Sequence, residues 1–203
     1  IGIFGISRIR KIKEREEILF NKMTTPLTYL AAMVERFHRA RINVYALLSS
    51  KKKSKIQRLK SRLYDHLKKF KESLEKFKKT ALSQRMKDTI KETEIGREKY
   101  LAFIKNFMTL IEGKKIEQAN TLANTKGYNA ATSFQTALDN LVKYKNEDAA
   151  GLNKESEIIA TNTVILMIIV SLVGFITALM LGMLISRSIS RPVKAGVDFA
   201  KSI

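Results

Sequence analysis

The chain has 203 residues and a formal net charge of +19, with 38 lysines and arginines against 19 aspartates and glutamates. It contains no cysteine, which excludes disulfides, thiolate metal sites and cysteine nucleophiles, and its 2 histidines could hold zinc only together with carboxylates from other helices. With only 2 prolines and 9 glycines, the composition favours long helices over sheet.

The chain opens with the apolar run IGIFGI, shortly before the charged Arg8. Such a run is too short to span a bilayer, so we interpret residues 1–6 as the outer end of an earlier, truncated membrane span. A first long helix is predicted from about Ser7 to Ser50, because apolar residues recur at alternating spacings of three and four. Pro26 is expected to kink this helix or to loosen one of its turns. The apolar stripe, interrupted once at Arg41, consists of Met23, Leu27, Leu30, Val34, Phe37, Val44 and Leu48.

Three further stripes predict three more amphipathic helices, which must bury their apolar faces against one another. The second stripe contains Ile56, Leu59, Leu63, Leu67, Phe70, Leu74 and Phe77. The third contains Met86, Ile90, Leu101, Ile104, Met108 and Ile111, and the fourth contains Ala130, Phe134, Ala137, Leu141 and Tyr144. Breaks at residues 49–54, at Ser83 and at Gly113 separate these helices, and the last one begins near Lys114.

Residues 163–185 form an uncharged apolar run. As a helix this run would be about 35 Å long, enough to cross a hydrocarbon core of about 30 Å. Arg187, Arg191 and Lys194 follow it and favour the cytoplasmic side, which places residues 7–162 outside. We therefore predict an all-α fold, an antiparallel four-helix bundle continuous with a transmembrane helix. The expected location is the plasma membrane, with the bundle periplasmic or extracellular and membrane lipid as one partner.

Several short segments, taken in their order along the chain, carry a family resemblance. They are residues 21–27 (NKMTTPL) early in the first long helix, residues 41–43 (RIN) near its end, and residues 189–193 (ISRPV) after the span. The chain resembles a bacterial methyl-accepting chemotaxis protein with a four-helix-bundle ligand-binding domain, and residues 186–203 resemble the start of a HAMP domain. The resemblance implies a homodimeric receptor for a small molecule. Such a receptor passes its signal through the last helix and HAMP to a cytoplasmic kinase and adaptor.

Arg41 is the strongest candidate for contact with a ligand. It interrupts the apolar stripe, where an unpaired guanidinium costs on the order of several kcal/mol, so it needs an anion from a ligand or from the protein. Within the protein, the alternative partners are Glu35, Glu94 and Asp139. The resemblance to the aspartate-sensing member implies three ligand-binding positions spaced five and then four apart, and Tyr45 replaces the third arginine. The candidate ligand-binding residues are Arg36, Arg41, Asn43, Tyr45, Tyr128 and Thr132.

Other functions compete with ligand sensing. The lysine-rich segment from Lys51 to Lys79 could attract a polyanion by counterion release, but no reader motif accompanies it, and we expect no nucleic-acid partner. The sequence has no phosphate-binding glycine loop, nucleophile elbow or metal-ligand spacing, so we expect no enzyme activity, catalytic residue, metal or cofactor. Two alternatives remain: the sensor portion of a membrane histidine kinase or diguanylate cyclase, and a membrane-tethered helical module that binds another protein.

Overall fold

The computed structural model describes the backbone of residues 2–201 and the side chains of residues 6, 7 and 9–193. Ile1, Ser202 and Ile203, which belong to the predicted outer span end and HAMP start, lie outside the described residues. Over residues 2–201 no strand occurs, so the predicted all-α class is confirmed. The elements are α1 (Gly2–Ile18), the π-helix η1 (Leu19–Thr24), α2 (Thr25–Leu48), α3 (Lys53–Lys78), α4 (Gln84–Glu112), α5 (Ile116–Leu122), the π-helix η2 (Ala123–Gly127) and α6 (Tyr128–Lys201).

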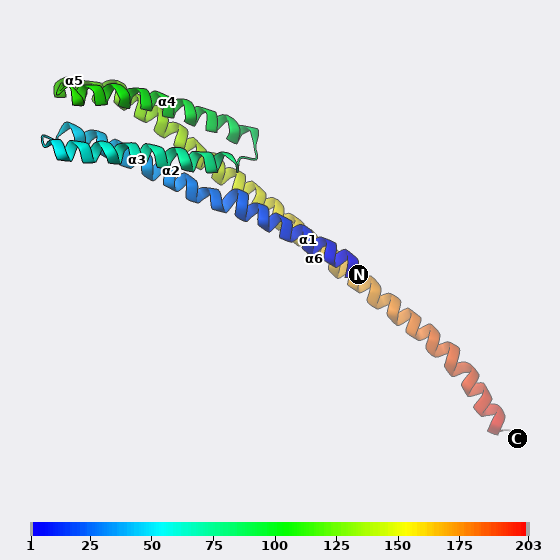
Figure 1. Ribbon diagram of the computed structural model, residues 1–203. Coiled ribbons are helices and arrows are strands. Elements are labelled where there is room, and N and C mark those ends of the chain that lie inside the picture. Colours follow the sequence, from blue (N-terminus) through cyan, green and yellow to red (C-terminus); the bar gives the residue numbers. More distant parts are fainter. Residues whose placement is uncertain (1, 202–203) are drawn as a thin grey trace. The chain divides into compact units, whose positions relative to one another are not determined.

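The chain divides into two compact units. The bundle unit comprises residues 15–154, and the second unit combines the start of α1 with α6 from Glu155 onward. In the bundle unit, α2, α3, α4 and the first part of α6 pack together as four helices (Figure 1). Only residues 49–52 join α2 to α3, and only residues 79–83 join α3 to α4. Such short connections make consecutive helices antiparallel, and the predicted four-helix bundle is confirmed.

The core of the bundle unit centres on four aromatic rings, one from each helix. Phe37 of α2 lies with its ring centre 4.6 Å from that of Phe134 of α6 and 5.3 Å from that of Tyr100 of α4. Phe70 of α3 completes the group, 5.1 Å from Phe134, and all three contacts are edge-to-face. All four residues are buried. These contacts place the four aromatic residues at the same level along the bundle. This level is the reference for the position of the candidate site.

The irregularity predicted at Pro26 is a loosened turn. Proline has no N–H group and cannot donate to the carbonyl four residues earlier, which here belongs to Lys22. The residues before Pro26 form η1, where Thr25 N–H donates to the carbonyl of Phe20, five residues back. The first long helix is therefore continuous through α1, η1 and α2 but contains one π-helical segment.

The end of α4 falls where the sequence predicted it, with a different residue in the left-handed conformation. Lys115 N–H donates to Leu110 at 2.9 Å and Lys114 N–H donates to Ile111 at 3.1 Å, the Schellman pattern. Lys114 has a φ of 56°, whereas Gly113 has a φ of −76°. The glycine stands one position before the residue that needs its conformational freedom. After this turn, α5, η2 and α6 follow one another directly in place of the single predicted helix.

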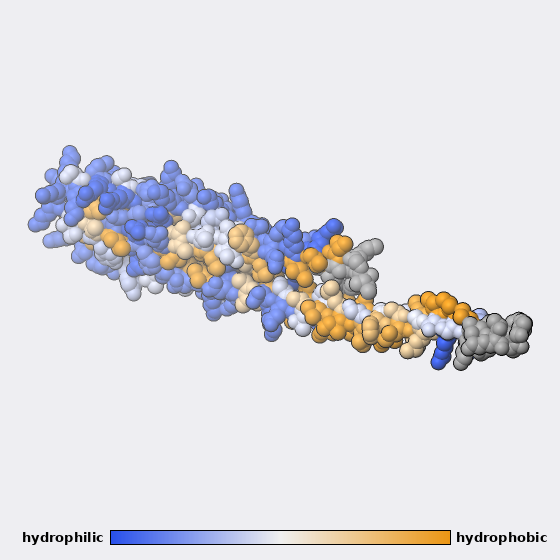
Figure 2. Space-filling model, turned by 90° about the horizontal axis from the view of Figure 1, so that it is seen from below, coloured by the Kyte–Doolittle hydropathy of each residue, from blue (hydrophilic) through white to orange (hydrophobic). Residues whose placement is uncertain are grey.

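The second unit contains the apolar part of α6. This part is long and apolar enough to cross a membrane, judged by length and composition. Its large side chains are exposed, as at Ile168 (62%) and Phe175 (64%), and Figure 2 shows them as a hydrophobic surface. The helix continues through Pro192 without a break.

Candidate ligand-binding site

Arg41 lies at the edge of the buried face of α2. Ala40 and Val44 occupy the buried positions, with 0% and 3% exposure, while Arg41 is half-buried. The apolar stripe therefore passes beside Arg41 instead of through it. The guanidinium carbon lies 5.7 Å from the centre of the Phe37 ring, within the range of a cation–π contact. The cation therefore lies against an aromatic ring, and the residue as a whole stays partly exposed.

Arg41 has no ion pair among the side chains that the structure describes. Each alternative protein partner is engaged elsewhere: Glu35 with Arg39 at 2.7 Å, Glu94 with Lys78 at 2.8 Å, and Asp139 with the amide of Gln135 at 2.8 Å. Because a partly desolvated guanidinium gains most from an anion, Arg41 is a cation still open to an external partner.

Tyr100 of α4 reaches the same place from the core. Its side chain is 1% exposed, and this burial raises the pKa of Tyr100 above its ordinary value. The Arg41 charge lowers the pKa of Tyr100 and the Tyr45 phenol raises it. The Phe37 ring contacts both Tyr100 and the Arg41 guanidinium, so these side chains are neighbours. Arg41, Tyr45 and Tyr100 therefore form one group at the edge of the core.

Tyr100 is the site residue that the sequence reasoning missed. A tyrosine fits an apolar stripe, and the stripe predicted for this helix ran through its neighbour Leu101. The predicted residues Ile104, Met108 and Ile111 are buried and Leu101 is half-buried. The structure also buries a second series, Gly96, Tyr100, Phe103 and Phe107. The spacing of four, three and four in that series was the available signal.

The start of α6 lies level with Arg41 and Tyr45. Because α6 runs antiparallel to α2 and Phe134 contacts Phe37, Arg41 is level with residue 130 and Tyr45 with residue 126. Tyr128 falls between these two levels and is 55% exposed, while Tyr45 is 44% exposed. Thr132, slightly further along α6, is also exposed. The two tyrosines on different helices can thus flank a ligand at the height of Arg41.

Two predicted site residues lie apart from this group. Five positions along a helix correspond to about 140° around its axis, so Arg36 and Arg41 face different directions. Arg36 is directed toward α3: burial lowers the pKa of His66 of α3, and the Arg36 charge lowers it further. Asn43 is buried, and its amide donates to the Arg39 carbonyl of its own helix at 2.9 Å.

The histidines and carboxylates of the described residues form no group of three or more that could hold a metal ion. His66 has a buried Nδ1 atom with no hydrogen-bond partner. Its surroundings include the positive charges of Arg36 and Arg39, which oppose the approach of a metal cation. We therefore assign no metal ligand in this part of the chain.

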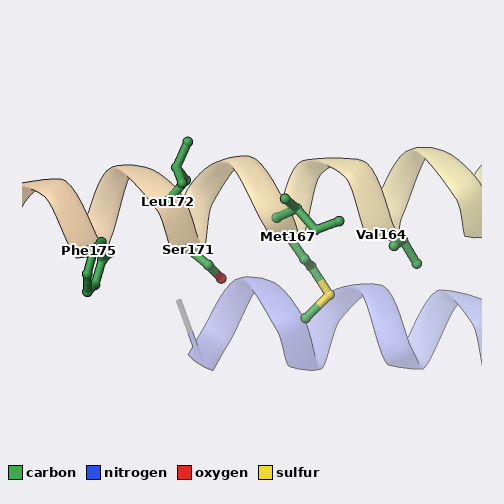
Figure 3. Close-up of a pocket in the computed structure, with 6 residues that line it drawn as sticks. Val164, Met167, Ser171, Leu172 and Phe175 are labelled. Carbon is green, nitrogen blue, oxygen red and sulfur yellow. The ribbon is translucent and has the colours of Figure 1, made fainter.

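The second unit has an open groove of a different character (Figure 3). It has a volume of about 490 Å³ and is lined by Val164, Met167, Ile168, Ser171, Leu172 and Phe175. The side chains of Met167 and Ser171 point toward the start of α1, which lies alongside within the same unit. Because the lining carries no charge and one hydroxyl, the groove suits packing of apolar side chains or lipid, not recognition of a small polar ligand.

Comparison with known proteins places this geometry in context. The family described as "four helix bundle sensory module for signal transduction" matches residues 1–160. A protein of Acetivibrio thermocellus, provisionally named as a sensory transducer, is 26% identical over 166 residues. The matched segment covers 81% of this chain and 28% of that protein. The chain therefore spans little more than a quarter of this relative's length.

Proposed function

The chain belongs to the family of four-helix-bundle sensory modules for signal transduction, and from this premise we propose that it is the ligand-sensing and transmembrane part of a chemoreceptor. In this proposal a small molecule binds the bundle, α6 carries the response across the membrane, and the segment after residue 185 begins a HAMP domain that acts on a cytoplasmic kinase and adaptor. Support comes from the continuity of α6, which runs from Tyr128 in the bundle to Lys201. An unbroken helix can transmit a displacement that a flexible linker would absorb.

The observation that carries the proposal is that Arg41 forms no ion pair with any side chain in the described part of the chain. A half-buried guanidinium beside the Phe37 ring, with the Tyr100 and Tyr45 phenols near it, can donate charge-assisted hydrogen bonds to an anionic group. Tyr128 supplies a further ring and hydroxyl at the same height. We therefore propose a small anionic ligand, held mainly by Arg41, with the exposed Tyr45 and Tyr128 contacting the rest of the ligand and the buried Tyr100 behind Arg41.

The proposed topology follows from charge and from symmetry. Arg187, Arg191 and Lys194 follow the apolar stretch of α6, so this end is placed in the cytoplasm and the bundle outside the plasma membrane. A receptor of this kind is proposed to act as a parallel homodimer about a two-fold axis. Single cysteines along residues 34–44, in the membrane-embedded protein, are expected to cross-link with helical periodicity.

The test of ligand binding uses the whole chain in lipid nanodiscs. A thermal-shift screen of small carboxylic acids, amines and aromatic compounds identifies a ligand that stabilises the native state. Calorimetric titration of that compound then compares Arg41→Ala with Arg39→Ala. We expect Arg41→Ala to lose roughly 1.5 to 3 kcal/mol of binding free energy, which weakens affinity by roughly tenfold to over a hundredfold.

Arg39→Ala is the matched control because Arg39 lies on the same helix, is exposed and already pairs with Glu35. It should change affinity little. Unchanged affinity in Arg41→Ala, together with a large loss of stability in the melting curve, would assign Arg41 a structural role and reject the ligand contact.

The output of the receptor is tested on the full-length protein. A long heptad-patterned hairpin with glutamate and glutamine methylation sites after Ile203 supports a chemoreceptor. A globular catalytic domain at that place supports a histidine kinase or a diguanylate cyclase instead.

A further inference from the structure

Lys145 of α6 is the one charged residue among the buried residues that the structure describes. Its side chain is 1% exposed. A buried ammonium loses its hydration, so lysine is almost never fully buried unless a partner replaces the water. The position of Lys145 therefore requires a specific acceptor.

That acceptor is created by the proline of the first helix. The Lys145 ammonium donates a hydrogen bond to the backbone carbonyl of Lys22 in η1. Lys22 stands four residues before Pro26, whose nitrogen has no hydrogen to offer this carbonyl. An ammonium from a different helix thus takes the place of the missing N–H donor.

The surroundings of this contact involve α3 as well. The Lys145 ammonium lies 5.8 Å from the centre of the buried Phe77 ring, within cation–π range. The side chain of Lys22 donates to the carbonyl of Lys79, directly after α3, at 3.2 Å. The first helix, α3 and α6 therefore meet at one polar point that contains the buried charge of Lys145.

One turn further along α6, Asp148 connects to the start of α4. Its carboxylate accepts a hydrogen bond from Ser83 at 2.8 Å and from Arg85 at 3.2 Å. Ser83 is also the N-cap of α4, since its hydroxyl accepts from Met86 N–H at 3.2 Å. Lys145 and Asp148 together connect α6 to η1 of the first helix, to the Phe77 ring of α3 and to the start of α4.

Apolar packing alone does not determine how far α6 is displaced along its axis. Buried residues of α6 recur at spacings of three and four, so a displacement of one repeat brings apolar side chains onto apolar side chains again. A buried polar residue with a single acceptor removes this degeneracy, because any other position leaves its polar group unpaired. The buried residues that show the repeat are Ala131, Phe134, Leu138 and Leu141.

We propose that Lys145 is a positioning residue, which fixes the axial register of α6 against the Pro26 break of the first helix and defines the resting position from which a signal displaces α6. The inference rests on the proposed function, in which α6 transmits the response. The inference assigns a role to Lys145 and Pro26, which are not part of the proposed ligand-binding site.

The experiment measures register directly. The chain has no native cysteine, so Leu82→Cys and Ser133→Cys accept two spin labels, one at the turn between α3 and α4 and one on the exposed face of α6. Their separation in nanodisc-embedded protein, measured by pulsed electron resonance, runs largely along the helix axes. We expect one narrow distance population with Lys145 present, and a broadened or divided population in Lys145→Met. Lys143→Met, which removes a lysine two positions earlier that lies outside the core, should retain the single population.

A second measurement separates positioning from general stability. Pro26→Ala restores an N–H donor to the Lys22 carbonyl, so Lys145→Met should lower the melting temperature less in a protein that carries Pro26→Ala than in one that retains Pro26. If Lys145→Met folds only when it is combined with Pro26→Ala, the proposal is supported. A single unchanged distance in Lys145→Met, or equal loss of stability with and without Pro26→Ala, overturns it. Neither measurement needs a ligand, so failure here is distinct from failure of the binding test.

Discussion

Lys114 has the conformation that most amino acids avoid. Its φ of 56° is the only positive value among the non-glycine residues that the structure describes. For a residue with a Cβ atom, the left-handed region costs roughly 1–2 kcal/mol. Lys114 stands at the C′ position of the Schellman motif, where glycine is the usual residue, and the native glycine precedes it. The turn between α4 and α5 is therefore formed at an avoidable conformational cost.

Lys114→Gly should stabilise the protein. Glycine removes the steric penalty at this position but adds entropy to the unfolded chain, so the net gain should be about 0.5–1 kcal/mol. Urea unfolding of the nanodisc-embedded chain, followed by helical circular dichroism, measures this difference. Because Lys114 is exposed, loss of its side chain should contribute little.

The matched control for this change is Lys115→Gly. Lys115 has a φ of −85°, which any residue adopts readily, so glycine there brings only the entropic cost. It should destabilise the protein by about 0.5–1 kcal/mol. Equal effects of the two substitutions would show that the left-handed conformation of Lys114 is not what limits stability.

Among the elements, η2 brings the backbone of one helix unusually close to another. An added Cβ atom at Gly127 would lie 2.5 Å from the Cε2 atom of the Phe103 ring. Phe103 is itself buried and packs against Phe107 and Tyr100, so its ring has little room to move. Glycine at this position therefore allows η2 to approach α4, next to the Tyr100 wall of the candidate site.

Gly127→Ala should destabilise the bundle by about 1–3 kcal/mol through overpacking against Phe103. Gly151→Ala is the matched control, because an added Cβ atom at Gly151 of α6 meets nothing within 4 Å. That control should gain roughly 0.5–1 kcal/mol from improved helix propensity. Thermal melts of both variants test the prediction. A neutral Gly127→Ala would mean that η2 can withdraw from α4 at little cost.

Local pattern predicted some elements of the fold more completely than others. The α3 stripe was nearly complete: Leu59, Leu63, Leu67, Phe70, Leu74 and Phe77 are all buried, and Ile56 is half-buried against the core. Basic residues fill the other face of that helix, so only one set of positions could be the core. The α6 stripe was displaced at two positions: Ala130 and Tyr144 were predicted and are half-buried, whereas their neighbours Ala131 and Lys145 are buried. Ala137 is buried as predicted, and so is its neighbour Leu138. Both series have helical spacing, and a lysine is not expected inside, so local pattern could not choose between them.

Prediction of the candidate site met a similar limit. Arg41 could be singled out because a charge in an apolar series is visible in one segment. Tyr100 and Lys145 could not, because their roles come from helices distant in sequence: Arg41 beside Tyr100, and the Lys22 carbonyl freed by Pro26. The spacing taken from the family resemblance grouped Arg36 with Arg41. Five positions along a helix correspond to about 140° around its axis, so these two side chains face different directions. Contacts between helices, not patterns within them, determined these outcomes.

At the scale of the whole molecule, positive charge is unevenly distributed. The chain carries a net charge of +19, and basic residues crowd the exposed face of α3. Several of them form no ion pair within the described part of the chain: Lys53, Lys55, Arg58, Arg62, Lys68, Lys71 and Lys76. Like charges three and four residues apart on one helix repel each other. This self-repulsion opposes the compact state and should respond to ionic strength.

Added salt should therefore stabilise the bundle. From 10 to 150 mM sodium chloride the Debye length falls from about 30 Å to about 8 Å, which screens repulsion along α3. A gain of about 1 kcal/mol would raise the melting temperature by roughly 2–4 °C for a chain of this size. Lys55→Glu, which places an acidic residue within one turn of Lys52 and Arg58, should raise the melting temperature at 10 mM salt and reduce the further gain at 150 mM. If salt lowered the melting temperature, attractive ion pairs such as Lys78 with Glu94 would outweigh the repulsion, and the basic face of α3 would not be the dominant electrostatic feature of the molecule.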